Sequence, residues 1–283
     1  MSRVGIIGLG LIGGSFAKAY HAAGWEVLAS NRTRSTLDFA VLAGDVNGEL
    51  TKENAGSCDL VLVTIYPEAA IRAIRDFAPH FGEKPIVMDC CGTKRVVCEA
   101  CFPIAEEYGF TYVGGHPMAG TQYSGYRYAR ANLYHNAPMV IVPPNYDDIF
   151  LLNRIKELLL PAGFGKISVT TAEKHDEMIA FTSQLAHVVS NAYIKSPTAA
   201  EHLSFSAGSY RDLTRVAKLN ETMWTELFLD NAEHLGFELD CLIKALQEYR
   251  DAIAAGDAKT LKQLLKDGRE RKEAIDTEWK EKK

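Results

Sequence analysis

The sequence lacks several features that would place it in other classes of protein. It has no apolar run approaching the roughly 18 residues that a membrane helix needs, and its first residues form a strand pattern instead of a signal peptide. A formal net charge of −5 and the absence of a long run of one sign argue against a nucleic-acid or anionic-membrane surface. We therefore expect a cytoplasmic protein that binds neither nucleic acid nor membrane.

The sequence also lacks a cysteine pattern typical of a disulfide framework or a metal site. Four of its six cysteines are clustered, namely Cys90, Cys91, Cys98 and Cys101. The adjacent pair does not match either half of a usual zinc-ligand pattern. In a chain without a secretory signal, reduced and mostly buried thiols are expected. We predict no bound metal.

What the sequence does contain is an apolar strand that leads directly into a glycine-rich turn. Residues 4–7 form the strand, and Gly8, Gly10 and Gly13 follow in G-x-G-x-x-G spacing. The first glycine permits a tight turn, the second lets a pyrophosphate approach the backbone, and the third lets the next helix pack closely. A second strand at residues 25–29 completes a unit of about 30 residues, which is typical of dinucleotide binding.

Two further segments are predicted to contact the dinucleotide. The first free N–H groups of the helix, at Leu11 and Ile12, face the pyrophosphate in such a site. An acidic residue normally binds the ribose after the second strand. This chain has Ser30, Asn31, Arg32 and Thr33 there. Hydroxyl and guanidinium groups can bind a 2′-phosphate that a carboxylate would repel, so NADP is predicted to be preferred over NAD. The alternative, a solvated loop in which Arg32 contacts nothing, stays open.

Strand and helix patterns alternate as far as residue 170. An α/β fold with a Rossmann-type doubly wound parallel sheet is indicated by strand patterns at residues 59–65, 85–89, 111–115, 139–142 and 166–169. Because the carboxyl ends of parallel strands face the cofactor, Thr64 and Tyr66 are predicted to line the nicotinamide site. From residue 171 onwards the pattern is helical. We predict a dinucleotide-binding domain over residues 1–170 and an all-α domain over residues 171–283.

Four motifs resemble those of the prephenate and arogenate dehydrogenases of tyrosine biosynthesis. Residues 114–120 resemble the family's GGHPxAG signature, and three further stretches match in the same order: 174–176 with 183–187, 208–217, and 220–224. The resemblance covers essentially the whole chain. It implies an oxidative decarboxylation of prephenate with hydride transfer to NADP or NAD. Arogenate is the alternative substrate.

The resemblance also implies roles for particular residues. His116 matches the catalytic histidine, and an imidazole can accept a proton at cellular pH. Arg215 matches the substrate-binding arginine, and a guanidinium suits a dianionic substrate in a protein of net negative charge. Arg211 lies one helical turn earlier and is predicted either to assist or to form an ion pair, for example with Asp212.

Two histidines and a threonine complete the predicted site. His187 matches a histidine of the substrate pocket and His175 another near it, but on a straight helix they lie about a third of a turn out of phase. Where relatives often have a serine that bonds the catalytic histidine, this chain has Gly92. We expect the neighbouring Thr93 to supply the hydroxyl, unless the interaction is missing.

The resemblance further implies a homodimer formed by the helical domain, which has an apolar stripe near Leu246, Leu261 and Leu265. Two alternatives remain. A 3-hydroxyacid dehydrogenase would need a lysine in a glycine-rich helical motif that this sequence lacks. A nucleotide-sensing protein that has lost catalysis is disfavoured by His116 and Arg215, although Gly92 favours it slightly.

Overall fold

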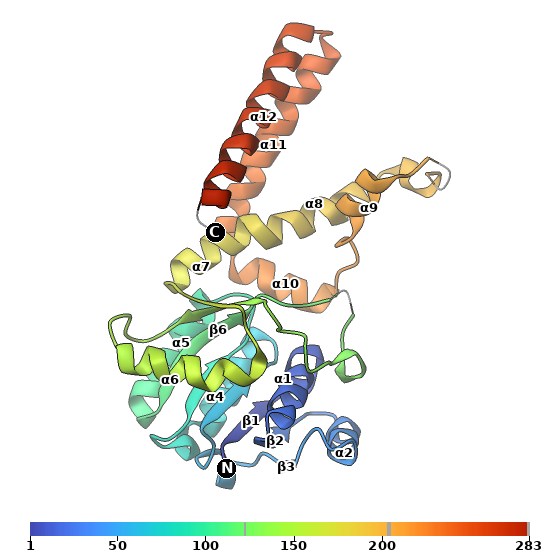
Figure 1. The fold of residues 1–283 in the computed structure, drawn as a ribbon. Coiled ribbons are helices and arrows are strands. Elements are labelled where there is room, and N and C mark those ends of the chain that lie inside the picture. Colours follow the sequence, from blue (N-terminus) through green and yellow to red (C-terminus); the bar gives the residue numbers. More distant parts are fainter. Residues whose placement is uncertain (122, 203–204, 282–283) are drawn as a thin grey trace. The chain divides into compact units, whose positions relative to one another are not determined.

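An eight-stranded sheet is the centre of the N-terminal part of the chain (Figure 1). The computed structural model describes residues 1–121, 123–202 and 205–281. The strand order is β3-β2-β1-β4-β5-β6-β7-β8. The strands are β1 (Arg3–Ile7), β2 (Glu26–Ser30), β3 (Gly48–Glu49), β4 (Leu60–Val63), β5 (Ile86–Asp89), β6 (Thr111–Pro117), β7 (Pro138–Val142) and β8 (Lys166–Val169). The predicted Rossmann-type sheet is confirmed, and the sequence analysis missed only the short β3.

The sheet is parallel from β3 to β6, and the last two strands run the other way. β6 pairs with β7 in antiparallel register, and β7 pairs with β8 in parallel. A parallel return would need a crossover, usually a helix. In the described part of the β6–β7 connection the only helix is a single 3₁₀ turn, Tyr126–Tyr128. The chain therefore returns beside β6 in the opposite direction.

Alternate residues of the central strands face two separate apolar clusters. Leu60 and Leu62 of β4 pack with Phe16 on one face, whereas Val61 and Val63 pack with Ile74 on the other. A sheet buried on both faces explains the continuous apolar runs in the sequence. Helices α1 (Leu11–Ala22), α2 (Arg34–Leu42) and α6 (Ile149–Leu159) contribute to the first cluster, and α3 (Lys52–Ala55), α4 (Pro67–Phe81) and α5 (Arg95–Tyr108) to the second.

The chain described after β8 is helical. α7 (Ala172–Ile179), a π-helical segment (Ala180–Leu185) and α8 (Ala186–Tyr193) form one continuous run. A 3₁₀ turn (Pro197–Ala200), α9 (Gly208–Thr214) and α10 (Glu221–Asp230) follow. By its internal contacts the chain divides into Met1–Ala232 and Glu233–Lys283. The change to helical structure thus comes near residue 170, as expected, but the first unit continues to residue 232.

The second unit is a pair of long helices. α11 (Ala232–Ala254) and α12 (Ala258–Glu281) lie side by side (Figure 1), and Tyr249 donates its hydroxyl to the carbonyl of Leu264 at 3.2 Å. Gly256 takes a positive φ of 64° in the turn between them. Several large apolar side chains on these helices are exposed, among them Leu246 and Leu265. None of the helices described is both long and apolar enough to cross a membrane.

Candidate active site

The glycine-rich turn lies where the strand order reverses, at the carboxyl ends of β1 and β4. Gly8 has a φ of +99° and donates its N–H to the carbonyl of Ser30 at 2.8 Å. A Cβ on Gly13 would lie 1.9 Å from the carbonyl oxygen of Gly8 and 2.4 Å from Oγ1 of Thr64. A Cβ on Gly10 would meet no atom within 4 Å. The structure therefore requires glycine at 13 for packing, whereas glycine at 10 leaves a space open.

The start of α1 borders the open space at Gly10. Gly10 is the N-cap residue and supplies no side-chain hydrogen bond to the helix. The first N–H groups of a helix have no partner inside it, so those of Leu11 and Ile12 are available to an anion. These features fit the pyrophosphate of a dinucleotide, which this turn would hold by its backbone.

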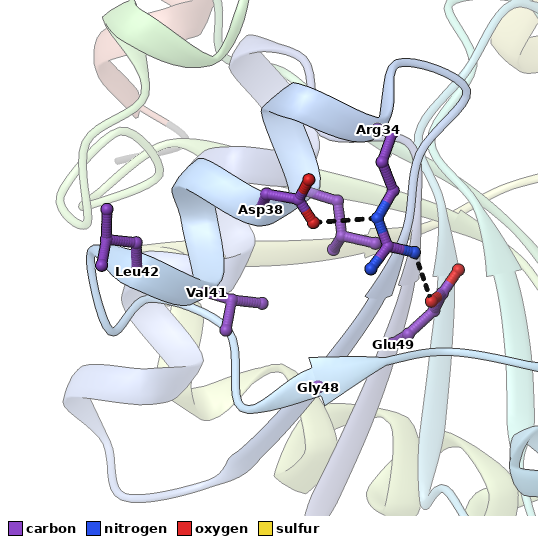
Figure 2. A pocket seen from close by; sticks show the side chains of 7 residues that line it. Arg34, Asp38, Val41, Leu42, Gly48 and Glu49 are labelled. Atoms are coloured by element: carbon purple, nitrogen blue, oxygen red, sulfur yellow. Dashed lines mark hydrogen bonds and ion pairs between the residues drawn. The ribbon is translucent and has the colours of Figure 1, made fainter.

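Two arginines that follow β2 differ in their partners. Arg34 is paired with carboxylates, whereas Arg32 has no ion pair with a described residue. Arg34 donates to Asp38 at 2.8 Å and to Glu49 at 2.7 Å, beside a cavity of about 410 Å³ on α2 (Figure 2). Its charge is already offset. Arg32 is exposed and has no ion pair with any residue that the structure describes. Asn31 shapes the loop, accepting the N–H of Leu9 at 2.8 Å. Of the two arginines, only Arg32 is available to a phosphate.

Thr64 and Tyr66 follow β4, as the sequence analysis expected, but they differ in what they offer a cofactor. The Thr64 hydroxyl donates to the carbonyl of Gly8 at 2.7 Å, so it holds the glycine turn in shape. Tyr66 is the N-cap residue of α4 and its side chain is 41% exposed. Thr64 therefore supports the site through the backbone, whereas Tyr66 remains accessible.

A buried carboxylate, which the sequence analysis missed, connects β5 and β6 beneath the site. Asp89 accepts hydrogen bonds from the Tyr112 hydroxyl at 2.6 Å, the N–H of Cys91 at 2.9 Å and the N–H of Gly115 at 3.2 Å. It also forms an ion pair with Lys94, and both side chains are fully buried. A Cβ on Gly115 would lie 2.5 Å from the Asp89 carbonyl oxygen. Close packing of β6 against β5 thus requires this glycine of the GGHP motif. In the sequence, the feature that could have indicated this buried carboxylate is an aspartate at the end of an apolar strand.

His116 lies near the end of β6 and is bonded through Nδ1 to Nε2 of His175 at 2.8 Å. The other ring nitrogen of His175 lies 2.6 Å from Oδ1 of Asp176. Burial, together with His175 and Lys94, holds the pKa of His116 well below its ordinary value. Its imidazole is therefore neutral at cellular pH, and Nε2 has no partner among the residues described.

His175, which the resemblance places near the substrate pocket, is buried in this structure. The residue is only 3% exposed, and both of its ring nitrogens are already bonded. It lies behind His116 because α7 packs against the start of α5, where Asp176 accepts the backbone N–H groups of Lys94 and Arg95. Sequence spacing alone did not indicate that one histidine would support another.

The π-helical segment changes the phase between His175 and His187. A π turn accommodates one residue more than an α turn, so the twelve residues between them count as about eleven of α-helix. Eleven residues turn through about 1,100°, only about 20° more than three full turns. The expectation of a third of a turn between the two histidines assumed a straight α-helix. The segment places both on the same side of the helix.

His187 lies at a second group of side chains between α8, α9 and α10. Its ring lies against that of Trp224 with the centroids 4.0 Å apart and the planes tilted by 30°, and its Nδ1 lies 2.8 Å from the carbonyl oxygen of Ser183. Burial lowers the pKa of His187, the Ser183 carbonyl raises it, and the Arg215 guanidinium lowers it. Arg215 and Arg211 are both exposed, and neither pairs with a carboxylate in the described part of the chain. The contact with Trp224 had not been predicted.

Thr93 does not bond His116, contrary to the sequence-based expectation. Its hydroxyl donates to Oδ2 of Asp230 at 3.2 Å, and Nδ1 of His116 is bonded to His175 instead. Burial raises the pKa of Asp230. A Cβ on Gly92 would lie 3.3 Å from the side chain of Leu227. The support of His116 thus comes from α7 and not from the end of β5.

Two family profiles match the chain. One is described as the nucleotide-binding domain of prephenate dehydrogenase and matches residues 17–168. The other is described as the dimerization domain of prephenate dehydrogenase and matches residues 171–267. The chain belongs to the prephenate dehydrogenase family. The match of the first profile begins at residue 17, inside α1 and directly after the glycine turn.

Relatives within this prephenate dehydrogenase family align over nearly the whole chain. Cyclohexadienyl dehydrogenase of Zymomonas mobilis is 30% identical over 98% of this chain and 97% of its own length. The crystal structure of Synechocystis arogenate dehydrogenase has a TM-score of 0.80 and 26% identity, covering 96% of this chain and 99% of that one. Prephenate dehydrogenase from A. aeolicus, in complex with hydroxyphenyl propionate and NAD⁺, has a TM-score of 0.80 and 25% identity, covering 97% and 98%.

A pair of glycine substitutions tests the nucleotide site. Gly10→Ala places a methyl group in open space, so the unfolding midpoint should stay unchanged while dinucleotide affinity falls by about tenfold or more, or at least about 1.4 kcal/mol. Gly13→Ala should lower both, because its methyl group overlaps the Gly8 carbonyl. Fluorescence titration and urea denaturation measure the two quantities. Undiminished affinity in the Gly10 variant would show that no pyrophosphate occupies this space.

Proposed function

We propose that this protein is a prephenate dehydrogenase that uses NADP in preference to NAD. The observation that carries the proposal is His116, a neutral imidazole with an unpartnered Nε2 at the end of β6 in a member of this family. Arogenate is the second candidate substrate, because the Synechocystis relative is an arogenate dehydrogenase. Relatives of both kinds align over nearly the full length of this chain.

The reaction needs few groups from the protein. Bound NADP supplies the acceptor for the hydride that leaves the ring carbon bearing the 4-hydroxyl. Nε2 of His116 accepts the proton of that hydroxyl as the carbon is oxidised. The ring carboxylate then departs as carbon dioxide and its bonding electrons complete the aromatic ring. His116 returns the proton to the phenolate oxygen. Atoms and charge balance without a metal or a further reactant.

Substrate binding is assigned to the group around α8, α9 and α10. Arg215 is the forked donor for a substrate carboxylate, since it is exposed and has no carboxylate partner among the described residues. His187, whose ring lies against that of Trp224, lies beside it. Arg211 assists from one turn away. In this proposal residues 171–283 form the substrate and dimerisation domain, and residues 1–170 bind the cofactor.

A homodimer is proposed for the active protein. The family profile that matches residues 171–267 is described as a dimerization domain. Leu246 and Leu265 on the long helices are each 58% exposed, which suits an interface better than solvent. The predicted cytoplasmic location, and the prediction that the protein binds neither nucleic acid nor membrane, stay predictions.

Replacing His116 with Asn tests the proposed base. The amide cannot take up a proton at neutral pH, so kcat should fall on the order of 10²–10⁴-fold, whereas the dinucleotide Kd should not change. Reduction of NADP at 340 nm in the presence of prephenate or arogenate measures the first, and fluorescence titration the second. Wild-type protein that oxidises neither substrate would refute the proposed function and favour a nucleotide sensor.

Arg32→Ala tests the cofactor preference. Loss of one charge-assisted contact should weaken NADP binding by about 1.5–3 kcal/mol, roughly ten- to a hundredfold in Kd, and leave NAD almost unaffected. Calorimetric titration with each cofactor measures the difference. Arg32→Lys is the matched control, because it keeps the charge and should recover part of the affinity. Equal weakening of both cofactors would mean that this loop does not recognise the 2′-phosphate.

Arg215→Ala tests the carboxylate site. We expect kcat/KM for the substrate to fall about ten- to a hundredfold, mainly through KM, because a charged hydrogen bond to the substrate is lost. Arg211→Ala, one turn earlier in α9, is the matched control and should cost less. Steady-state kinetics at saturating cofactor provide the comparison. A larger loss in the Arg211 variant would transfer the assignment to that residue.

A further inference from the structure

Three buried or half-buried side chains form a row that ends at the proposed base. Nδ1 of His116 lies 2.8 Å from Nε2 of His175, and Nδ1 of His175 lies 2.6 Å from Oδ1 of Asp176. We propose that Asp176, acting through His175, is a positioning residue that fixes the ring proton of His116 on Nδ1. Nε2 is then left as the unprotonated atom. The catalytic meaning of this arrangement rests on the proposed function.

Asp176 determines which ring nitrogen of His175 carries the proton. Its side chain is fully buried, and Oδ1 accepts the N–H of Lys94 at 2.7 Å while Oδ2 accepts the N–H of Arg95 at 2.8 Å. These backbone groups can only donate. A carboxyl proton would compete with them, whereas the carboxylate satisfies both and also accepts from His175. Nδ1 of His175 must therefore carry the proton in this contact.

The proton on His175 determines the tautomer of His116. A neutral imidazole has one N–H and one lone pair, so Nε2 of His175 is an acceptor. It faces Nδ1 of His116, which must then be the donor. Burial lowers the pKa of both histidines, and this keeps both rings neutral. If the row ran the other way, Nε2 of His116 would be protonated and could not accept a proton from a substrate.

The same row stabilises the charge that forms when His116 takes up a proton. Two other charged side chains, Lys94 and Asp89, lie near the imidazoles, but they are paired with each other. Asp176 is thus the carboxylate that can offset an imidazolium at position 116. Its contact with the first N–H groups of α5 holds it in place, so the stabilising charge needs no rearrangement during the reaction.

The proton positions can be observed directly in the substrate-free protein. Long-range ¹H–¹⁵N correlation spectra of the full chain labelled with ¹⁵N-histidine distinguish the two tautomers of each ring. The chain has eight histidines, and the spectrum of His116→Asn identifies the signals of position 116. We expect both His116 and His175 to carry their proton on Nδ1. A His116 ring protonated on Nε2 above its pKa would overturn the proposal.

Two sets of variants separate positioning from simple structural support. Asp176→Asn should abolish the Nδ1–H preference of His116 and lower kcat on the order of 10²–10⁴-fold, with KM and dinucleotide Kd within about twofold of wild type. His175→Gln keeps an oxygen that can accept from Nδ1 of His116, so it should retain more kcat than His175→Phe. An unchanged His116 tautomer in the Asp176 variant, or equal kcat in the two His175 variants, would contradict the proposal.

The spectrum of the wild-type protein, assigned with His116→Asn, decides the matter even if the Asp176 or His175 variants do not fold. It also separates this proposal from the proposed function. A protein that shows the expected tautomers but oxidises neither prephenate nor arogenate would keep the proton arrangement and lose the assigned reaction. A protein that oxidises prephenate with the opposite tautomer would keep the reaction and lose the part assigned to Asp176.

Discussion

Two buried carboxylates hold the start of α5, and the geometry of the site depends on them. Asp89, at the end of β5, pairs with the Lys94 side chain, and Asp176 of α7 accepts the backbone N–H groups of Lys94 and Arg95. Removing one member of a buried ion pair costs about 3–5 kcal/mol because the remaining charge is left uncompensated. Through the start of α5, these two carboxylates together join the sheet to α7, the first helix of the helical region. His116, on β6 of that sheet, is bonded to His175 of that helix.

The arginines of this protein differ in whether a carboxylate already offsets their charge. Arg34 is neutralised by two carboxylates, whereas Arg32, two residues earlier, has no such partner among the residues described. Arg215 is likewise exposed beside His187 without a described ion pair. In a chain with a net charge of −5, anions must be bound by such local groups and not by the overall field. At His116 burial lowers the pKa and so disfavours a positive charge on the imidazole.

The π-helical segment shows how one local irregularity changes a site. It lies between α7 and α8, and it moves His187 to the side of the helix that His175 occupies. The two histidines nevertheless differ in the partners of their ring nitrogens. His175 has both ring nitrogens bonded inside the protein, whereas Nε2 of His187 has no described partner. The spacing of two histidines in a sequence cannot show which of them has its ring nitrogens bonded inside the protein. A prediction from spacing uses the geometry of a uniform helix, and it does not include the neighbours that face each ring nitrogen.

The sequence by itself determined the parts of this protein that depend on local constraints. The G-x-G-x-x-G spacing, the apolar strands and the change to helical periodicity near residue 170 follow from backbone sterics and burial, which act over a few residues. The tertiary structure alone decided that Thr93 bonds Asp230, that His175 supports His116, and that Asp89 and Asp176 hold α5. Except for the ion pair between Asp89 and Lys94, which lie five residues apart, these contacts join residues far apart in the chain. Hydrogen-bond partners depend on distances of a few ångströms, which only the packing of strands and helices against one another sets.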